Sequence, residues 1–320
     1  MSHDDGLCSI GELAERAGVT VKAVRFYSDN GLLPEAARSA GGHRRYGPDA
    51  LGRLRMLRSL RALGLPVREV RRVLDEEEKN GAQDGAGSVL EDVVAGQLRE
   101  LGSQLTALRW REAGMRLVLE CPPGERADRL RLIGAVSTPP STAPLARFWR
   151  AWLPPRMPAR ATAAFLEVAV VQPPEDPDPV QVLAFARLNA LVTRPCTGAE
   201  RPQPEAHKAA GPRGPAVLYA GLAQAYELAG TQLRRGHGPY AGEELDCFVD
   251  AYASAYGSRD TPAFRSALSG QLAVDPRIDR YWELVTGVIT APGSPPEPTA
   301  GTAHDWLLAA LDAQTATAAG

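Results

Sequence analysis

The chain has 320 residues, of which 44% are hydrophobic and 23% are charged, which is typical of a soluble protein with room for two domains and a connector. No apolar run is long enough to span a membrane, and the N-terminus lacks the basic-then-apolar pattern of a signal peptide. We therefore expect a cytoplasmic protein with no membrane partner. The four cysteines, which are Cys8, Cys121, Cys196 and Cys247, lie far apart, and this spacing excludes a disulfide framework.

The net charge of −2 conceals a strong asymmetry along the chain. Residues 9–74 carry 13 basic and 6 acidic residues, a net charge of +7, whereas the remainder carries 23 basic and 32 acidic residues, a net charge of −9. A basic module joined to an acidic remainder is typical of a protein that binds nucleic acid at one end and another partner at the other.

Two short helices are predicted at the N-terminal end. Ser9 and Glu12 have the three-residue spacing of a capping box, which predicts a helix from Ser9. Thr20 is a suitable N-cap for a second helix, because its hydroxyl can accept a hydrogen bond from a free amide of the first turn. Gly31 ends this second helix, and Pro34 prevents an early restart.

A basic hairpin follows the second helix. Gly41 and Gly42 supply a tight turn, and arginines lie on both sides of it. We interpret this hairpin as a wing that contacts the DNA backbone beside a recognition helix. The residues predicted to contact DNA are Thr20, Lys22, Arg25, Tyr27, Arg38, Arg44, Arg45 and Tyr46.

Two further helices are predicted near Pro48 to Leu63 and Val67 to Glu78. Their apolar residues recur at helical spacing, and arginines occupy the opposite faces. These arginines either contact phosphates or form a solvated face. In the first of these helices, the residues predicted to face the protein core are Leu51, Leu54, Leu57, Leu60 and Leu63.

These motifs together resemble the MerR family of bacterial transcription regulators over roughly the first quarter of the chain. The resemblance rests on Ser9–Ala14, Gly18-Val19-Thr20, Val24–Tyr27, Gly31–Pro34 and Gly42–Tyr46, and it continues with Leu63–Val67 and Val70. It implies a winged helix-turn-helix, a dimerisation helix and a C-terminal domain of the effector-binding type. At positions 26 and 43, Phe and His replace the Tyr that is often found in the family, and we expect Phe26 to serve packing.

The resemblance also implies a mechanism. The recognition helix would enter a major groove and the wing would rest on the adjacent backbone, so that a dimer binds an inverted repeat. The protein would bend and untwist a promoter whose elements are too far apart, which allows RNA polymerase to engage both. Many phosphate contacts must supply the energy for that deformation.

One long helical pattern runs from Ser88 to Glu120 and would span about 50 Å. Its apolar residues alternate spacings of three and four, with one polar gap at Glu112, which predicts a coiled-coil seam. We expect a second copy of the chain to cover this seam, and the family resemblance implies an antiparallel pairing. The alternative is packing against the C-terminal domain of the same chain. The predicted seam residues are Leu90, Val94, Leu98, Leu101, Leu105, Leu108, Met115 and Leu119.

The remaining residues are predicted to form a helical domain whose helices are separated by Pro and Gly. Helices are predicted near 143–153, 159–171, 178–193, 215–235, 241–257, 261–273, 276–290 and 303–314, with loops at 195–214 and 292–301. The stretch 275–285 and Trp306-Leu307-Leu308 resemble a C-terminal region of actinobacterial MerR-like regulators, which implies an effector or interaction domain.

Most aromatic residues lie in this C-terminal region. Aromatic walls with a nearby carboxylate suit an apolar or cationic small molecule, although aromatics at helical spacing also form ordinary cores. The residues predicted to contact a ligand are Trp149, Trp152, Tyr219, Tyr226, Tyr252 and Tyr256.

The sequence offers no basis for catalysis or for a resident metal or cofactor. Catalytic and nucleotide-binding motifs are missing, and the cysteines do not cluster as thiolate ligands do. We therefore predict a mainly α protein that is not an enzyme. It would comprise a DNA-binding domain at 1–80, a dimerisation helix at 88–121 and an effector or interaction domain at 122–320. Two alternatives remain: a C-terminal domain that binds a protein instead of a small molecule, and an architectural DNA-binding protein that never switches.

Overall fold

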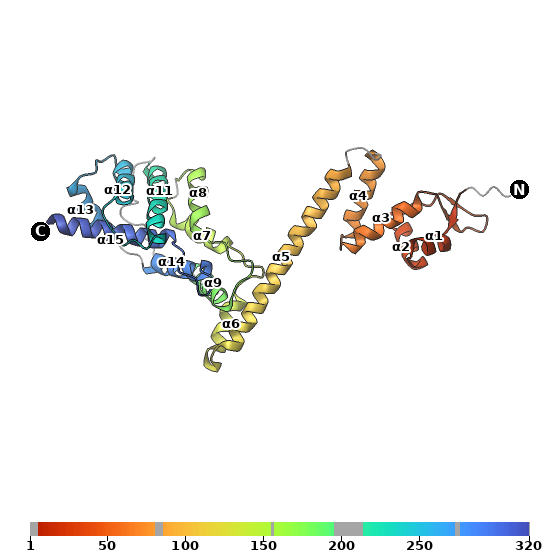
Figure 1. Cartoon of the computed structure of the whole chain (residues 1–320), viewed down its shortest axis with the longest axis horizontal. Helices are drawn as coiled ribbons and strands as arrows, with labels where there is room; N and C mark the ends of the chain where they lie inside the picture. Colours follow the sequence, from red (N-terminus) through yellow and green to blue (C-terminus); the bar gives the residue numbers. More distant parts are fainter. Residues whose placement is uncertain (1–5, 81–85, 155–156, 195–213, 273–275, 320) are drawn as a thin grey trace. The chain divides into compact units, whose positions relative to one another are not determined.

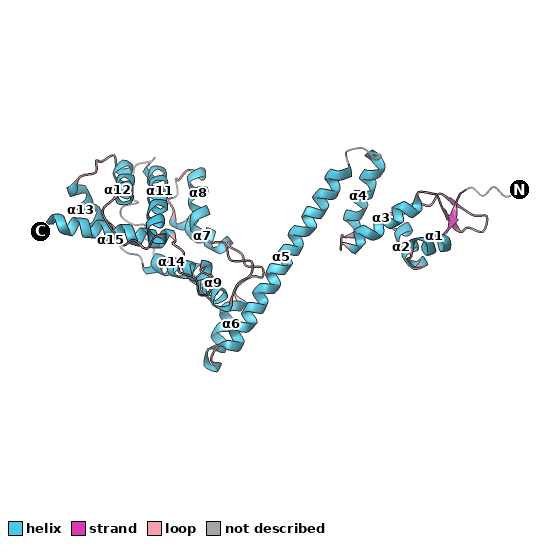
Figure 2. Cartoon of the chain, in the orientation of Figure 1, coloured by secondary structure: helices cyan, strands magenta, loops and turns pink. Residues whose placement is uncertain are grey.

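The structure is a computed structural model, and it describes residues 6–80, 86–154, 157–194, 214–272 and 276–319. The fold is mainly helical with one small sheet near the N-terminus, as predicted (Figure 2). The chain forms two compact units, residues 1–103 and 104–320, which we describe separately. Among the described residues, no helix is both long and apolar enough to cross a membrane.

The N-terminal unit begins with two capped helices. The elements are β1 (Cys8–Ser9), α1 (Ile10–Ala17) and α2 (Val21–Asp29). The predicted capping box is present: the Ser9 Oγ accepts from the Glu12 amide at 3.3 Å, and the Ser9 amide donates to the Glu12 carboxylate at 2.7 Å. The Thr20 hydroxyl caps α2 by accepting from the Ala23 amide at 3.1 Å. Both helix starts are therefore set by local side chains.

The predicted hairpin is also present. Strands β2 (Ala37–Arg38) and β3 (Arg44–Tyr46) are antiparallel, and β1 pairs with the other edge of β3, which gives the strand order β1-β3-β2. Gly42 adopts a φ of 78°, a conformation that glycine reaches without steric cost. This turn fixes the register between Arg38 and Arg44.

Two further helices, α3 (Ala50–Ala62) and α4 (Val67–Asn80), complete the core of this unit. Leu54, Leu57 and Leu60 are buried as predicted, but Leu63 is 63% exposed, because α3 has already ended there. The arginines of α3 also take part in the packing of this unit. Three of them donate to backbone carbonyls of neighbouring segments: Arg53 to Leu32, Arg58 to Ala17 and Arg61 to Leu65.

The longest helix is α5, which runs from Ala86 to Glu120 and is drawn in yellow in Figure 1. Its 35 residues agree with the predicted helix, in spite of the glycines at positions 96, 102 and 114. Its first turns pack in the N-terminal unit, where Val89, Leu90 and Val93 join the core formed by α3 and α4. Its last turns belong to the C-terminal unit.

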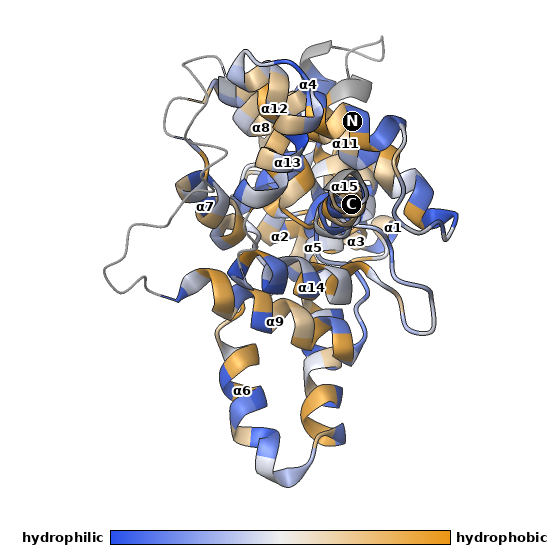
Figure 3. Ribbon diagram, turned by 90° about the vertical axis from the view of Figure 1, so that its left-hand side faces the viewer, coloured by the Kyte–Doolittle hydropathy of each residue, from blue (hydrophilic) through white to orange (hydrophobic). Residues whose placement is uncertain are grey.

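The C-terminal unit is a cluster of helices. Two elements that were not predicted come first, the 3-10 turn η1 (Pro123–Glu125) and α6 (Arg126–Gly134). α6 lies beside the end of α5 (Figure 3). Ile133 of α6 approaches α5 at Gly114. The other helices are α7 (Ala143–Trp152), α8 (Ala159–Ala169), α9 (Pro179–Thr193), α11 (Gly214–Arg234), α12 (Glu243–Tyr256), α13 (Pro262–Gln271), α14 (Pro276–Ile289) and α15 (Ala300–Ala319).

The predicted helices agree with these bounds to within a few residues, except that α15 begins earlier and ends later than expected. The predicted loop at 195–214 lies almost wholly outside the described residues. Two apolar clusters form the core of the unit. One lies mainly among α11, α12, α13 and α15, and the other joins α7, α9 and α14 to the end of α5.

The contact between α11 and α12 offers a test of this packing. A Cβ atom built on Gly221 would lie 2.5 Å from the Ala251 Cβ, so Gly221→Ala should overpack the interface and destabilise the unit by about 1–3 kcal/mol. All five tryptophans lie in the unit 104–320, so urea unfolding followed by tryptophan fluorescence reports on this unit.

The matched control is Gly230→Ala on the same helix, where the new Cβ would meet only the flexible Arg234 side chain at 3.6 Å. This control should be neutral or stabilising by up to about 1 kcal/mol, because alanine favours helix. Equal midpoints for the two variants would contradict the close approach of α11 and α12.

Candidate nucleic-acid interface and candidate ligand cavity

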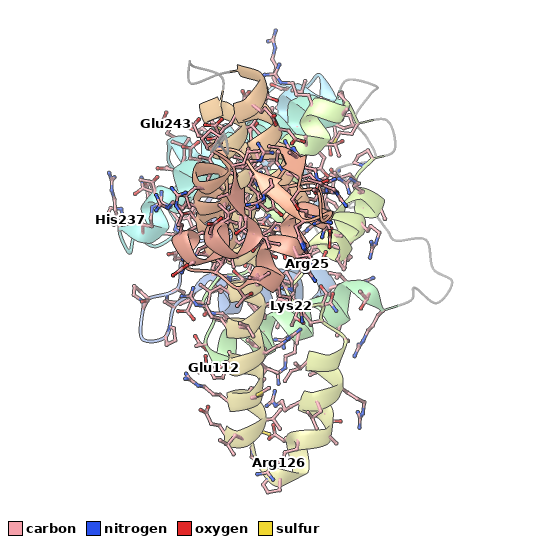
Figure 4. All side chains as sticks on the ribbon, turned by 90° about the vertical axis from the view of Figure 1, so that its right-hand side faces the viewer. Lys22, Arg25, Glu112, Arg126, His237 and Glu243 are labelled. Atoms are coloured by element: carbon pink, nitrogen blue, oxygen red, sulfur yellow. The ribbon has the colours of Figure 1, made fainter. Side chains whose placement is uncertain are left out.

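Helix α2 has one buried side and one exposed, basic side. Val24 is fully buried, whereas Lys22 and Arg25 are exposed and lie one turn apart (both labelled in Figure 4). Phe26 lies beside them; its ring meets that of Tyr27 edge to face with centroids 5.6 Å apart, but it is 49% exposed, so the predicted packing is only partial. Thr20 is exposed at the start of the helix, where its side chain serves as the cap. The exposed side therefore presents two cations and one aromatic ring to an outside partner.

Most of the basic residues of the wing are held by carboxylates. Arg38 is exposed and pairs with Glu35 at 3.0 Å. Arg44 pairs with Asp29 at 2.6 Å and with Glu35 at 3.3 Å, and the hydrogen bond to Asp29 is the largest cause of the raised pKa of its guanidinium. Arg44 thus ties the wing to the end of α2. Arg45 is half-buried on the central strand of the sheet.

The two predicted tyrosine contacts differ in their surroundings. Tyr46 has no exposed surface and its hydroxyl donates to the Ser28 Oγ at 3.3 Å. Its side chain is therefore part of the core, and the prediction that it contacts DNA is corrected: it fixes β3 against α2. Tyr27 is half-buried and packs against both apolar clusters of the unit.

The exposed face of α5 carries the predicted seam from Leu98 onward. Leu98, Leu101, Leu105, Leu108, Met115 and Leu119 are between 48% and 77% exposed. Leu90 packs instead into the core of its own N-terminal unit, so the predicted seam is corrected at this end, and Val94 is half-buried. In the polar gap, Glu112 pairs with Arg116 at 2.6 Å (Glu112 is labelled in Figure 4).

A different face of the same helix is buried in the C-terminal unit. Trp110, Ala113 and Leu117 join the apolar cluster of α7, α9 and α14, and the Trp110 indole donates to the Pro174 carbonyl at 2.9 Å. The ring of Trp110 also meets Phe185 edge to face, with centroids 5.4 Å apart. The helix therefore packs against the same chain through residues other than those of the predicted seam, which stays exposed from Leu98 onward.

A cavity of about 230 Å³ lies within the C-terminal unit, between its two apolar clusters. Five of the six residues predicted to contact a ligand line it. The sixth, Tyr256, lies behind Tyr252, with ring centroids 6.4 Å apart. The lining aromatic residues are Trp149, Trp152, Phe165, Tyr219, Tyr226, Tyr252 and Trp282. Sequence reasoning missed Phe165 and Trp282, although each has an aromatic partner in the lining: Trp149 meets Phe165 at 5.2 Å and Trp282 at 5.8 Å.

Few polar groups reach this cavity. The Tyr226 hydroxyl and the His304 Nδ1 lie 3.0 Å apart and share a hydrogen bond. Burial lowers the pKa of His304 to about 4, so this imidazole is neutral near pH 7. Asp279 and Asp305 also line the cavity, and both are exposed to solvent, which places them at its mouth. The lining thus combines aromatic walls with an acidic rim.

Metal-ligating groups do not converge in the described parts of the chain, where no cluster of three or more His, Cys, Asp or Glu residues could hold an ion. Cys8, Cys121 and Cys247 are free thiols, and Cys196 lies outside the described residues.

Comparison with known proteins places the resemblance at the N-terminal end. The family model for MerR HTH regulatory proteins matches residues 8–77. The nodulation protein NolA of Bradyrhizobium sp. (strain NC92) is 44% identical over 66 residues, which are 21% of this chain and 28% of NolA. The transcriptional activator TipA of Streptomyces coelicolor is 46% identical over 68 residues, which are 21% of this chain and 27% of TipA.

A third relative matches over most of its own length. The transcriptional regulator HmrR of Rhizobium leguminosarum bv. viciae is 34% identical over 122 residues, which are 38% of this chain and 91% of HmrR. This chain therefore spans less than a third of NolA and TipA but nearly all of HmrR.

The exposed side of α2 leads to a prediction for Arg25→Ala. If Arg25 neutralises a phosphate, the variant should bind all duplex sequences more weakly, and the slope of log Kd against log salt should fall by about 1. Binding is measured by fluorescence anisotropy over a range of salt concentrations. The matched control is Arg126→Ala, which removes the same charge from α6 (Figure 4) and should leave the slope unchanged.

An unchanged slope for Arg25→Ala would contradict its phosphate role. Tyr46→Phe provides a further comparison, because it removes a buried hydroxyl that donates to Ser28 and interacts with Arg44, and leaves the exposed cations of α2 in place. This variant should destabilise the N-terminal unit by about 1 kcal/mol and keep the wild-type salt slope.

Proposed function

Because this chain belongs to the MerR family of transcriptional regulators, we propose that it is a DNA-binding regulator that acts as a homodimer and responds to a small molecule. In this proposal the N-terminal unit binds promoter DNA, α5 joins two copies, and the cavity of the C-terminal unit holds the effector.

The exposed side of α2 supports the DNA-binding role. Lys22 and Arg25 stand on a short helix whose opposite side is anchored by Val24, which is the arrangement of a recognition helix in a major groove. The wing follows directly, with Arg38 exposed and Arg44 held to the same helix. Helix and wing can therefore bind one stretch of duplex together.

The exposed seam of α5 is the main observation that supports the proposed dimer. Six large apolar side chains at coiled-coil spacing are exposed to solvent in the single chain. Burial of such a side chain is favourable by roughly 1.5–3 kcal/mol when it is complete, so association that covers the seam would be stabilising. A second copy of the same helix offers the matching surface. Two-fold symmetry would then present two recognition helices to two half-sites, so the operator is an inverted repeat.

The family resemblance extends the proposal to the promoter. A dimer that bends and untwists its site brings separated promoter elements into reach of RNA polymerase, which is then a functional partner. The cost of deforming the duplex is offset by phosphate contacts, for which the N-terminal unit has its excess of basic residues.

The cavity supports a response to a small molecule. A concave aromatic cavity favours a sensor over a domain that binds another protein, because a protein partner would need an exposed apolar surface. Trp149 lines the cavity and belongs to the same apolar cluster as Trp110 of α5. We infer that a ligand which displaces Trp149 changes the packing of the dimerisation helix.

Leu105→Glu tests the dimer. Leu105 is 48% exposed, so the monomer tolerates a carboxylate there, whereas burying that charge in the seam should cost several kcal/mol. We expect the dimer dissociation constant, measured by analytical ultracentrifugation, to rise by roughly a hundredfold or more. Affinity for the full operator should fall with it.

The control is Ser103→Glu, which adds the same charge to an exposed position of α5 outside the seam and should leave the dimer intact. A Leu105→Glu protein that remains dimeric would overturn the proposed interface. Independently, sequences selected by the wild-type protein from a random duplex library should contain an inverted repeat, and a single half-site would contradict the symmetric dimer.

A further inference from the structure

A hydrogen-bonded pair of polar side chains lies among the apolar walls of the cavity in the C-terminal unit. The Tyr226 hydroxyl on α11 and the His304 Nδ1 on α15 are 3.0 Å apart, and both residues line the cavity. Both are half-buried, so part of their surface remains accessible. The pair therefore offers hydrogen-bonding groups to a ligand that otherwise meets mainly aromatic and aliphatic side chains.

Aromatic packing holds this pair in place. The fully buried Phe248 of α12 meets the His304 ring with centroids 5.7 Å apart, and the Tyr226 ring meets it edge to face at 5.9 Å. One turn before His304, Gly301 lies so near Trp282 that a Cβ would not fit between them, which fixes α15 against α14. Groups that are positioned before a ligand arrives lower the entropic cost of binding it.

The pair is uncharged near pH 7. Burial lowers the pKa of His304 to about 4 and raises the pKa of Tyr226 far above its ordinary value. The same loss of water would penalise a charged ligand group placed beside the pair. The acidic residues of the lining, Asp279 and Asp305, are exposed to solvent. The surroundings of the pair therefore favour a neutral polar group.

One hydrogen-bond donor remains free in either tautomer of His304. If the Tyr226 hydroxyl donates to Nδ1, the proton of the neutral ring is on Nε2; if Nδ1 donates, the hydroxyl hydrogen is free. In the part of the chain that the structure describes, neither side chain makes a second hydrogen bond. A donor without an acceptor is unfavourable in an apolar site, so the cavity favours a ligand that supplies an acceptor.

We propose that the effector is a neutral, largely apolar molecule with a hydrogen-bond acceptor oxygen, such as a ketone carbonyl, which accepts from the Tyr226–His304 pair. This inference rests on the proposed function, because it assigns a chemical class to the effector of the same cavity. The aromatic walls bind the apolar part of the molecule, and the pair selects the polar group.

Two probes of nearly equal shape isolate the acceptor. They are 2-acetylnaphthalene, which has a carbonyl oxygen, and 2-isopropenylnaphthalene, which has a methylene group in its place. Each is titrated by calorimetry into the full chain at pH 7. Because the two probes also differ in hydration, the quantity compared between proteins is the ratio of their affinities.

The double variant Tyr226→Phe with His304→Leu removes both members of the pair, so that no polar group is left without its partner. We expect the affinity for the ketone, relative to that for the hydrocarbon, to fall about fivefold. Retained binding of the hydrocarbon shows that the variant is folded. The matched control is Tyr256→Phe, which removes a tyrosine hydroxyl behind Tyr252 and outside the lining, and which should keep the wild-type ratio.

Infrared spectroscopy provides a measurement that needs no variant. With carbon-13 in the carbonyl of 2-acetylnaphthalene, the band of the ketone bound to the wild-type protein should lie at lower frequency than in cyclohexane, because a hydrogen bond weakens the C=O bond. This measurement decides the question even if the double variant does not fold.

The outcomes separate this inference from the proposed function. An unchanged affinity ratio in a folded double variant, or a bound carbonyl band at the cyclohexane frequency, would overturn the acceptor class and leave an apolar effector site in place. If neither probe binds to the folded wild-type protein, the small-molecule site itself fails, and with it the sensor part of the proposed function.

Discussion

The packing of helix α5 is the interaction on which the rest of the structure depends, because one face of the helix is buried in the protein and another is exposed to solvent. Trp110, Ala113 and Leu117 are buried among the helices of the C-terminal unit, whereas Leu105, Leu108 and other large apolar side chains remain in solvent. Burial of one face stabilises the helix in spite of its glycines, since tertiary packing outweighs intrinsic propensity. The exposed face is then free for a second copy.

In the N-terminal unit, a few interactions are enough to position the short helix α2. The Thr20 cap sets the start of α2, Val24 anchors its buried side, and Arg44 holds its end to the wing through Asp29. An arginine that resembles a phosphate ligand in sequence thus has a positioning role. Lys22 and Arg25, by contrast, are exposed on the helix itself.

The residues that sequence reasoning misplaced share one cause. Phe26 and Tyr46 are both aromatic and both lie near the family motifs, yet Phe26 is half exposed and Tyr46 is fully buried. Their polarity predicts the reverse. Tyr46 can be buried because its hydroxyl donates to Ser28, whereas the Phe26 ring meets that of Tyr27 and leaves about half of its surface exposed. The missed α6 has a mixed pattern of charge and apolarity, and its apolar residues gain their neighbours, which belong to α5 and α9, only in the folded unit.

Local rules in the sequence determined the capped helices α1 and α2, the wing turn, the length of α5 and the helical character of the C-terminal unit, because each depends on neighbours within a few residues. Tertiary structure alone decided which face of α5 is buried. It also gathered Trp149, Tyr219 and Tyr252 with Asp305 around one cavity, since these residues come from four helices spread over more than 150 positions. The spacing of residues along the chain determines which side chains share one face of a helix, but tertiary packing decides which helix faces are in contact.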